Sequence, residues 1–271
     1  MKVSHLIKVD NLDWQVDRKS VLSGVSFTLS KGETVGVVGP NGAGKTSLLK
    51  CLYGEHRNFA GNISLTGKPI TQLSRNQLAK TIAVVAQTNV SIFNLSVYDV
   101  VRMGLLPHKA LFESDTEADI NLINRALQQV DLLDKQHQAY ATLSGGEQQR
   151  TLIARAIVQQ SPILIMDEPT NHLDIYYQHQ LIGLAKNTGR TLLLAIHDLN
   201  LAAQYCDRLI LLNQGQVVAD DTPNNVLTAK RLKQVFRLDC IVDQNPHLAC
   251  PRVTFAPNKI NDRQMTGAKH G

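Results

Sequence analysis

The sequence predicts an α/β domain that carries a small antiparallel β-subdomain and a helical insertion. Three observations support this fold class. Short apolar runs typical of buried parallel strands alternate with helical patterns, at 34–38, 82–86, 163–166, 192–196 and 209–212. Near the N-terminus, alternating half-exposed segments predict antiparallel strands, at 3–13, 21–29 and 61–66. Between residues 91 and 160 strand signals give way to helical ones.

The helical insertion and the C-terminal end set the expected domain boundaries. A capping box is predicted at Ser114–Glu117, and it precedes apolar residues at helical spacing, Ile120, Ile123, Leu127 and Val130. After Asp239 the pattern fades into prolines and a polar end, so a loosely held tail is expected. We therefore expect one domain over 1–240, with its core at 1–88 and 162–240, its helical subdomain at 89–161, and a tail at 241–271.

Composition limits the classes of protein to consider. The 271 residues include 43% hydrophobic residues, and 28 Lys and Arg against 23 Asp and Glu give a formal charge of +5, which is unlike a disordered chain. The longest apolar runs are strand-sized, and the N-terminus lacks the apolar core of a secretion signal, so a cytosolic protein is expected. The sequence contains no run of basic residues of the kind that would predict nucleic-acid binding. The four cysteines are widely spaced and are interpreted as small apolar residues.

A phosphate-binding loop is the strongest local motif. The strand at 34–38 runs into G-x-x-x-x-G-K-T, and the residues expected to bind ATP phosphates are Gly39, Pro40, Asn41, Gly42, Ala43, Gly44, Lys45, Thr46 and Ser47. The glycines turn backbone N–H groups toward the phosphates, Lys45 reaches the β- and γ-phosphates, and Thr46 offers its hydroxyl to Mg²⁺. The alternative is a glycine-rich turn with a surface lysine.

Two carboxylates end the apolar run at 163–166. Asp167 and Glu168 emerge at the carboxyl end of a buried strand, where α/β sheets place their ligands. An acidic pair there suits Mg²⁺ positioning by Asp167 and activation of a water molecule by Glu168. The alternative is an acidic turn without chemistry.

The segment 143–150, Leu-Ser-Gly-Gly-Glu-Gln-Gln-Arg, precedes a helix with one apolar face. Ser144 can cap that helix while Gly145 and Gly146 expose N–H groups, so the segment could hold a second phosphate. A plain capped helix is the alternative.

Together these motifs resemble the ATP-binding-cassette (ABC) family over residues 3–239. Segment 143–150 is similar to the family's signature sequence, Gln87 to its Q-loop glutamine, and His197 to its switch histidine. Asn171-His172-Leu173-Asp174 is similar to the D-loop, in which Asp174 is the site residue. The resemblance implies a P-loop NTPase (RecA-like) core, with ATP and Mg²⁺ as cofactors.

The resemblance also implies roles for these residues and a second subunit. Glu168 and His197 are the catalytic residues, and Thr46, Gln87 and Asp167 form the metal site. Ser144, Gly145, Gly146 and Glu147 contact ATP held by another subunit, so two copies enclose two ATP molecules. Family members usually stack adenine on an aromatic residue, for which Trp14 is the nearest candidate; a core or surface tryptophan is the alternative.

One segment indicates the type of cassette. Residues 95–108 are similar to the helical insertion of iron-chelate importers, with a departure at Leu105. The resemblance implies a peripheral subunit on the cytoplasmic face of the inner membrane that energises uptake of an iron–siderophore or haem. Its partners would be transmembrane permease subunits and, indirectly, a periplasmic or lipoprotein substrate-binding protein. A cobalamin importer, an exporter cassette and a soluble non-transport ABC ATPase are the alternatives.

Overall fold

The computed structural model describes residues 5–86, 95–110, 112–171 and 173–256. The strands are β1 His5–Val16, β2 Lys19–Ser30, β3 Thr34–Val38, β4 Ala60–Leu65, β5 Lys68–Pro69, β6 Ile82–Val85, β7 Ile163–Asp167, β8 Thr191–Ala195, β9 Arg208–Asn213, β10 Gln216–Asp221, β11 Cys240–Gln244 and β12 Pro251–Phe255. The α-helices are α1 Lys45–Leu52, α2 Arg75–Thr81, α3 Val97–Arg102, α4 Glu117–Gln129, α5 Gly145–Gln159, α6 Ile175–Asn187, α7 Leu199–Tyr205, α8 Pro223–Val226 and α9 Ala229–Phe236. Within the described ranges, no helix has both the length and the apolar character needed to span a membrane.

The larger sheet has six strands in the order β10-β9-β3-β8-β7-β6. β9, β3, β8, β7 and β6 run parallel, and β10 pairs antiparallel with β9. All five parallel strands coincide with the apolar runs, because strands covered on both faces are apolar throughout. Both α/β character and strand positions are therefore confirmed.

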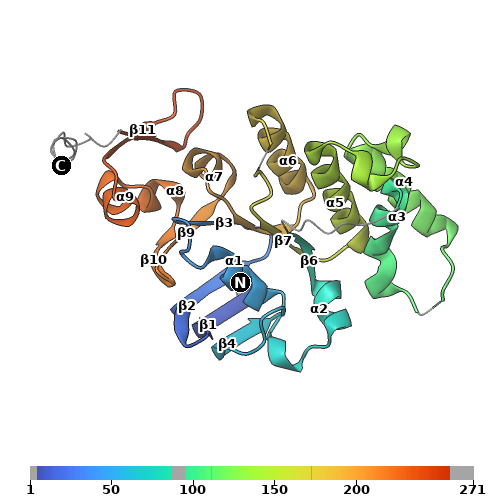
Figure 1. Ribbon diagram of the computed structural model, residues 1–271, viewed down its shortest axis with the longest axis horizontal. Coiled ribbons are helices and arrows are strands. Elements are labelled where there is room, and N and C mark those ends of the chain that lie inside the picture. The colour runs from blue at the N-terminus through green and yellow to red at the C-terminus, as the bar shows by residue number, and fades with distance from the viewer. Residues whose placement is uncertain (1–4, 87–94, 111, 172, 257–271) are drawn as a thin grey trace, which may run out of the picture.

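The smaller sheet has the order β2-β1-β4-β5 and is antiparallel, as the alternating segments predict. Figure 1 shows this sheet and α1 on one side of the larger sheet, and α5, α6 and α7 on the other. Alternate residues of the parallel strands accordingly enter two apolar cores. In β7, for example, Ile163 and Ile165 face the core shared with α1, whereas Leu164 and Met166 face the core shared with α5.

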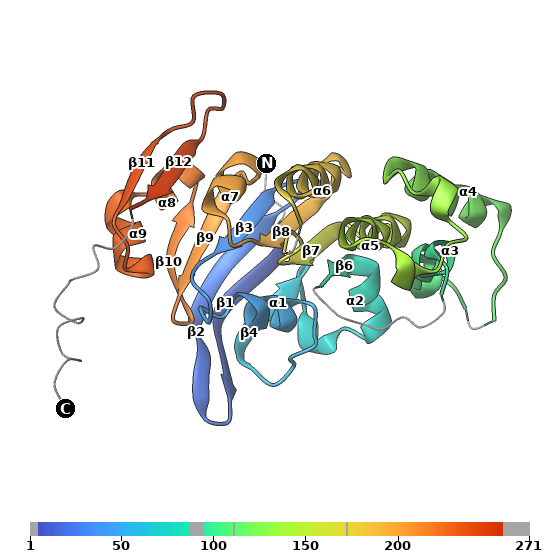
Figure 2. The ribbon, with the colours of Figure 1, turned by 45° about the horizontal axis from the view of Figure 1, so that its top comes forward.

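The helical insertion contains α3, α4 and α5, at the end of the molecule opposite β11 and β12 (Figure 2). The predicted capping box is displaced by two residues. α4 begins at Glu117, so Thr116 is its N-cap: the Thr116 hydroxyl accepts from the Asp119 N–H at 3.2 Å, and Asp119 accepts from the Thr116 N–H at 2.8 Å. Ser114 lies before the cap, where its carbonyl oxygen accepts from Lys109.

Residues Met103–His108 form a 3-10 helix that joins the insertion to the core. The Pro107 carbonyl accepts from Asn76 Nδ2 at 2.9 Å, and His108 Nε2 lies 2.9 Å from the Gln159 carbonyl oxygen. A side chain at position 104 would clash with α5, because a Cβ on Gly104 would lie 2.4 Å from a backbone carbonyl oxygen of that helix. Leu105, which departs from the iron-importer pattern, is buried in the core of the insertion.

The C-terminal segment differs from the loosely held tail that the sequence predicts after Asp239. β11 and β12 form an antiparallel hairpin, and Cys250 and Val253 are buried in the same apolar core as α7. The last residues of the predicted tail, 257–271, lie outside the described part of the chain.

The cysteines pack as small apolar side chains, as predicted. Cys51, Cys206 and Cys250 are buried and unpaired, and Cys240 is partly buried. Burial raises the pKa of the Cys51 and Cys206 thiols to about 12, so both stay protonated and unreactive at neutral pH.

A charged cluster ties the two sheets together. The Arg208 guanidinium, on β9, bonds the Glu33 carboxylate at 2.6 Å, Asp220 at 2.5 Å and the Thr28 carbonyl oxygen at 2.5 Å. Each of the three charged side chains is a quarter exposed or less. The cluster therefore links β9 and β10 with the end of β2.

Replacing Arg208 with leucine should lower the free energy of unfolding by about 2–3 kcal/mol, because Glu33 and Asp220 lose their shared cation in a poorly hydrated place. Urea denaturation followed by circular dichroism measures the change. The matched control is Arg252→Leu, which removes a guanidinium paired with Asp243 where both side chains are nearly half exposed. That variant should stay within about 0.5 kcal/mol of the wild type; equal losses would contradict the assignment.

Candidate functional site

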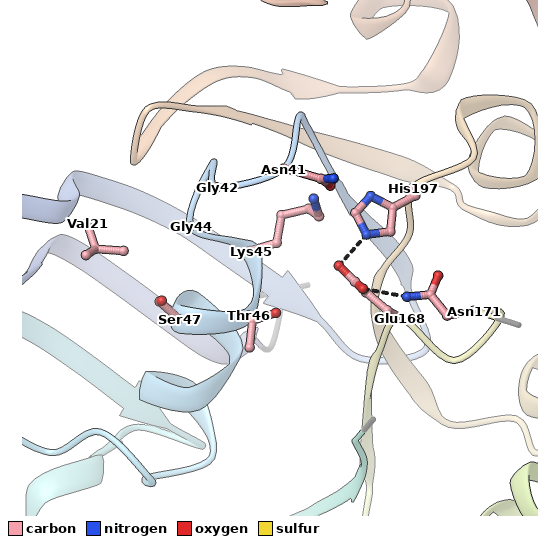
Figure 3. Close-up of a pocket in the computed structure, with 10 residues that line it drawn as sticks. All are labelled: Val21, Asn41, Gly42, Gly44, Lys45, Thr46, Ser47, Glu168, Asn171 and His197. Atoms are coloured by element: carbon pink, nitrogen blue, oxygen red, sulfur yellow. Dashed lines mark hydrogen bonds and ion pairs between the residues drawn. The ribbon is translucent and has the colours of Figure 1, made fainter. Parts of the chain in front are cut away.

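The phosphate-loop residues and the two catalytic candidates line one cavity at the carboxyl ends of β3, β7 and β8 (Figure 3). Its lining residues are Val21, Asn41, Gly42, Gly44, Lys45, Thr46, Ser47, Glu168, Asn171 and His197. Carboxyl ends of parallel strands are where α/β sheets bind ligands. Residues more than 150 positions apart in the sequence thus meet at the predicted place.

The loop backbone is shaped by its glycines and fixed from behind. Gly39 has φ 149°, and a Cβ there would lie 2.2 Å from the Leu212 carbonyl oxygen. The Ala43 N–H donates to the Pro40 carbonyl at 3.1 Å, and the Ala43 carbonyl accepts from Gly215 at 3.0 Å. Gly44 precedes α1 without any side-chain cap. The first N–H groups of α1 are therefore left for an anion to accept.

Lys45 lies at the centre of the cavity wall. Its side chain is buried, and Nζ donates to the Gly39 carbonyl at 2.9 Å and to the Pro40 carbonyl at 3.3 Å. Burial lowers the pKa of Lys45, an effect opposed by the carboxylates of Glu168 and Asp167. Phosphate oxygens compete well for this ammonium group because a charged acceptor outweighs neutral carbonyls.

Thr46 and Asp167 supply two neighbouring oxygen atoms. The Thr46 hydroxyl donates to Asp167 Oδ1 at 3.2 Å. Asp167 is 6% exposed, and burial raises the pKa of its carboxyl group. A buried carboxylate beside a hydroxyl group is a donor set that suits Mg²⁺, a hard cation that takes one or two carboxylates together with phosphate oxygens and water. The residues present therefore fit the predicted metal.

Glu168 is held by two side chains. Asn171 Nδ2 donates to Glu168 Oε2 at 2.7 Å, and His197 Nε2 lies against Glu168 Oε1. The Glu168 backbone has φ 49°, in the left-handed region, and its N–H donates to the Ala195 carbonyl of β8 at 3.1 Å. The carboxylate points into the cavity (Figure 3), where it could accept a proton from water.

Asn171 is a site residue that the sequence reasoning did not select. It was recognised only as part of the D-loop pattern, although its position three residues after Glu168 is the spacing at which a turn brings side chains together. The Asn171 N–H also donates to the Glu168 carbonyl at 3.2 Å, closing that turn. Val21, which lines the cavity from β2, was missed because nothing local marks it.

His197 follows β8 by two residues and projects into the cavity opposite Lys45 (Figure 3). The chain before it is fixed by Ile196, whose N–H donates to the Val37 carbonyl of β3 at 3.1 Å. A histidine here could donate a hydrogen bond to a terminal phosphate.

The predicted signature segment lies at the start of α5 and does not line this cavity. Ser144 is the N-cap, its hydroxyl donates to Glu147 Oε2 at 2.8 Å, and Lys135 contacts the other oxygen of Glu147. Lys135 and Ser144 together lower the pKa of Glu147 to about 2. Gly145 and Gly146 complete the first turn of the helix. These four predicted residues therefore lie away from the phosphate-loop cavity of their own chain.

The described part of the D-loop caps the next helix. Asp174 is the N-cap of α6 and accepts from the Tyr177 N–H at 3.0 Å. The two following side chains, Ile175 and Tyr176, are 74% and 68% exposed. His172 lies outside the described residues, as does Gln87, so the predicted Q-loop contact has no structural account.

Trp14 is not among the residues that line this cavity, and its place beside adenine stays a prediction. Its ring stacks on His56 with centroids 4.1 Å apart and planes 10° from parallel. It borders a separate hollow with Asn58 and Phe59. The register of β1 relative to β2 shifts on both sides of Trp14.

Comparison with known proteins identifies the family. The model of the family described as ABC transporter matches residues 22–171. The hemin import ATP-binding protein HmuV of Pseudomonas fluorescens (strain Pf0-1) is 39% identical over 256 residues, which cover 92% of this chain and 99% of that protein. The protein of the same name from Plesiomonas shigelloides is 40% identical over 257 residues, covering 87% and 96%.

Solved structures agree. An inward-facing metal-chelate type ABC transporter aligns with a TM-score of 0.82 and 27% identity, covering 94% of this chain and 98% of that one. The cbiO1 protein of Clostridium perfringens aligns with a TM-score of 0.73 and 27% identity, covering 85% and 94%. With its matched motifs and its sheet topology, this chain belongs to the ABC transporter family, as an ATP-hydrolysing ATP-binding cassette with a P-loop NTPase core.

Proposed function

We propose that this chain is the ATPase subunit of an importer that carries an iron chelate, most specifically haem, across the inner membrane. The observation that carries the proposal is its likeness to hemin import ATP-binding proteins over nearly the whole of both chains. The metal-chelate type transporter is the structural counterpart. Segment 95–108, which resembles the helical insertion of iron-chelate importers, also supports the proposal.

The cavity supports hydrolysis of ATP by water. Lys45 and the N–H groups at the start of α1 would bind the phosphates, and Glu168 would take a proton from the attacking water. Asn171 orients the Glu168 carboxylate, while His197 is placed to donate to the γ-phosphate. Because His197 and Glu168 touch, moving His197 toward phosphate would free one carboxylate oxygen for the water.

Mg²⁺ is the second proposed cofactor. Thr46 and Asp167 would hold it, with Gln87 as a further ligand by resemblance. When bound, the ion would neutralise charge that develops on the phosphate oxygens.

A second copy of the chain would complete each site. Ser144, Gly145, Gly146 and Glu147 lie outside the cavity of their own subunit, which supports contact with ATP held by a partner copy. The exposed Ile175 and Tyr176 beside the D-loop supply apolar surface for that contact. We further propose transmembrane permease subunits as partners, a periplasmic or lipoprotein substrate-binding protein as an indirect one, and a peripheral place on the cytoplasmic face of the membrane.

The test is affinity purification of the tagged chain from detergent-solubilised membranes of its host, followed by mass spectrometry. We expect a polytopic permease, and, after reconstitution with it, ATP-dependent haem uptake by proteoliposomes. A tagged unrelated cytosolic protein purified in parallel controls for background. Uptake of cobalamin but not of haem would show that the proposed cargo is wrong. Recovery of soluble partners or nucleic acid alone would overturn the transporter assignment.

A further inference from the structure

One side chain of α7, that of Asn200, hydrogen-bonds the C-terminal hairpin. Asn200 Nδ2 donates to the Val253 carbonyl at 3.0 Å, and the Val253 N–H donates to Asn200 Oδ1 at 2.7 Å. A side-chain amide that donates to and accepts from the same residue replaces the ladder bonds of a neighbouring strand. The outer edge of β12 is therefore paired with α7, 53 positions earlier in the sequence.

The same asparagine belongs to the turn that follows His197. Asp198 is the N-cap of α7, and its Oδ1 accepts from the N–H groups of Asn200 at 2.8 Å and Leu201 at 3.0 Å. On its other side, His197 follows Ile196, which is bonded to β3. His197 is thus held between one anchor on the central sheet and one at the start of α7, and Asn200 bonds to that second anchor and to the hairpin.

Packing strengthens this link. Val253 is 6% exposed and belongs to the same apolar cluster as Leu199 and Leu201 of α7. Phe255 of β12 meets Phe236 of α9 edge to face, with ring centroids 5.8 Å apart. α7 has only seven residues, so its placement depends on such contacts more than on its own helix propensity. In Figure 2 the hairpin lies beside α7 and far from the helical insertion.

We propose that Asn200 is a positioning residue for His197, through which the C-terminal hairpin sets the rate of ATP hydrolysis. The amide holds the first turn of α7 against β12, and that turn fixes where His197 leaves the chain. Loss of the two bonds lets His197 drift from the γ-phosphate position without touching the phosphate loop. The inference rests on the proposed role of His197 in hydrolysis.

The test is Asn200→Ala in the full-length chain. We expect kcat for ATP hydrolysis to fall about tenfold or more, since displacement of a catalytic group by about 1 Å can cost a hundredfold, while KM and the equilibrium affinity for ATP stay within twofold. In the double variant with His197→Ala, Asn200→Ala should cause no further loss, because both changes remove the same interaction. If Asn200 only stabilised the fold, Asn200→Ala would lower kcat by the same factor in the wild-type and His197→Ala backgrounds.

The matched control is Arg252→Ala, which breaks the exposed ion pair with Asp243 in the same hairpin and should leave kcat unchanged. Asn200→Asp keeps the shape and the acceptor for the Val253 N–H but loses the donor, so its kcat should lie between wild type and Asn200→Ala, even if the alanine variant does not fold. Wild-type kcat in folded Asn200→Ala or in Asn200→Asp, beside a His197→Ala variant whose kcat is reduced but still measurable, would overturn the proposal. Wild-type turnover in His197→Ala would instead remove the proposed role of the histidine itself.

Discussion

Replacing Glu168 with glutamine should lower ATP turnover by about 10²- to 10⁴-fold, the usual contribution of a positioned general base. Glutamine keeps the size of the side chain and an oxygen that can accept from Asn171, but it cannot take a proton from water. ATP binding should survive, because Lys45 and the phosphate loop are unchanged. Phosphate release measures turnover, and equilibrium binding of labelled ATP measures affinity.

The same variant should accumulate a dimer with ATP bound, since hydrolysis is what would separate the two copies. Size-exclusion chromatography with and without ATP and Mg²⁺ reports this directly. Glu117→Gln, the same chemical change at the exposed start of α4, serves as the control and should behave as wild type. Turnover within twofold of wild type in Glu168→Gln would remove Glu168 from its catalytic role.

Replacing Lys45 with alanine should weaken ATP binding itself by about 2–4 kcal/mol, or about 30- to 1,000-fold, through loss of charge-assisted hydrogen bonds to the phosphates. The effect differs in kind from that of Glu168→Gln, because affinity and turnover fall together. Isothermal titration with a non-hydrolysable ATP analogue measures it.

Lys50→Ala is the matched control for this change. Lys50 lies on the same helix, but its ammonium group pairs with Glu55 instead of facing the cavity. Its affinity for nucleotide should stay within twofold of wild type. An unchanged affinity in Lys45→Ala would show that the phosphate-loop assignment is wrong.

The parts of this molecule that could be predicted are those encoded by consecutive residues. The strand, loop and first helical turn of the phosphate loop follow one another from β3 into α1, so the local pattern specified both conformation and chemistry. The parallel strands could be predicted equally well, because burial on both faces leaves continuous apolar runs such as 192–196.

The missed features depend on distant or irregular contacts. β12 begins with Pro251, which suggested an unstructured tail, yet proline is tolerated at the first position of an edge strand. The hairpin is held by its own strand pairing, by buried apolar side chains and by hydrogen bonds to Asn200, which is far away in the sequence. Asn171 was missed because its partner, the Glu168 carboxylate, is brought within reach only by the turn that follows β7.

Because the backbone of Glu168 is in the left-handed region, stability and catalysis make conflicting demands on the residue at this position. A residue other than glycine, asparagine or aspartate has a conformational penalty at such a φ, and the strained backbone itself adds no stability to the folded chain. Glycine would relieve it but would bring no carboxylate. At this one position stability and catalysis therefore favour different amino acids, so a stabilised form of the protein selected without regard to activity would tend to lose its base first.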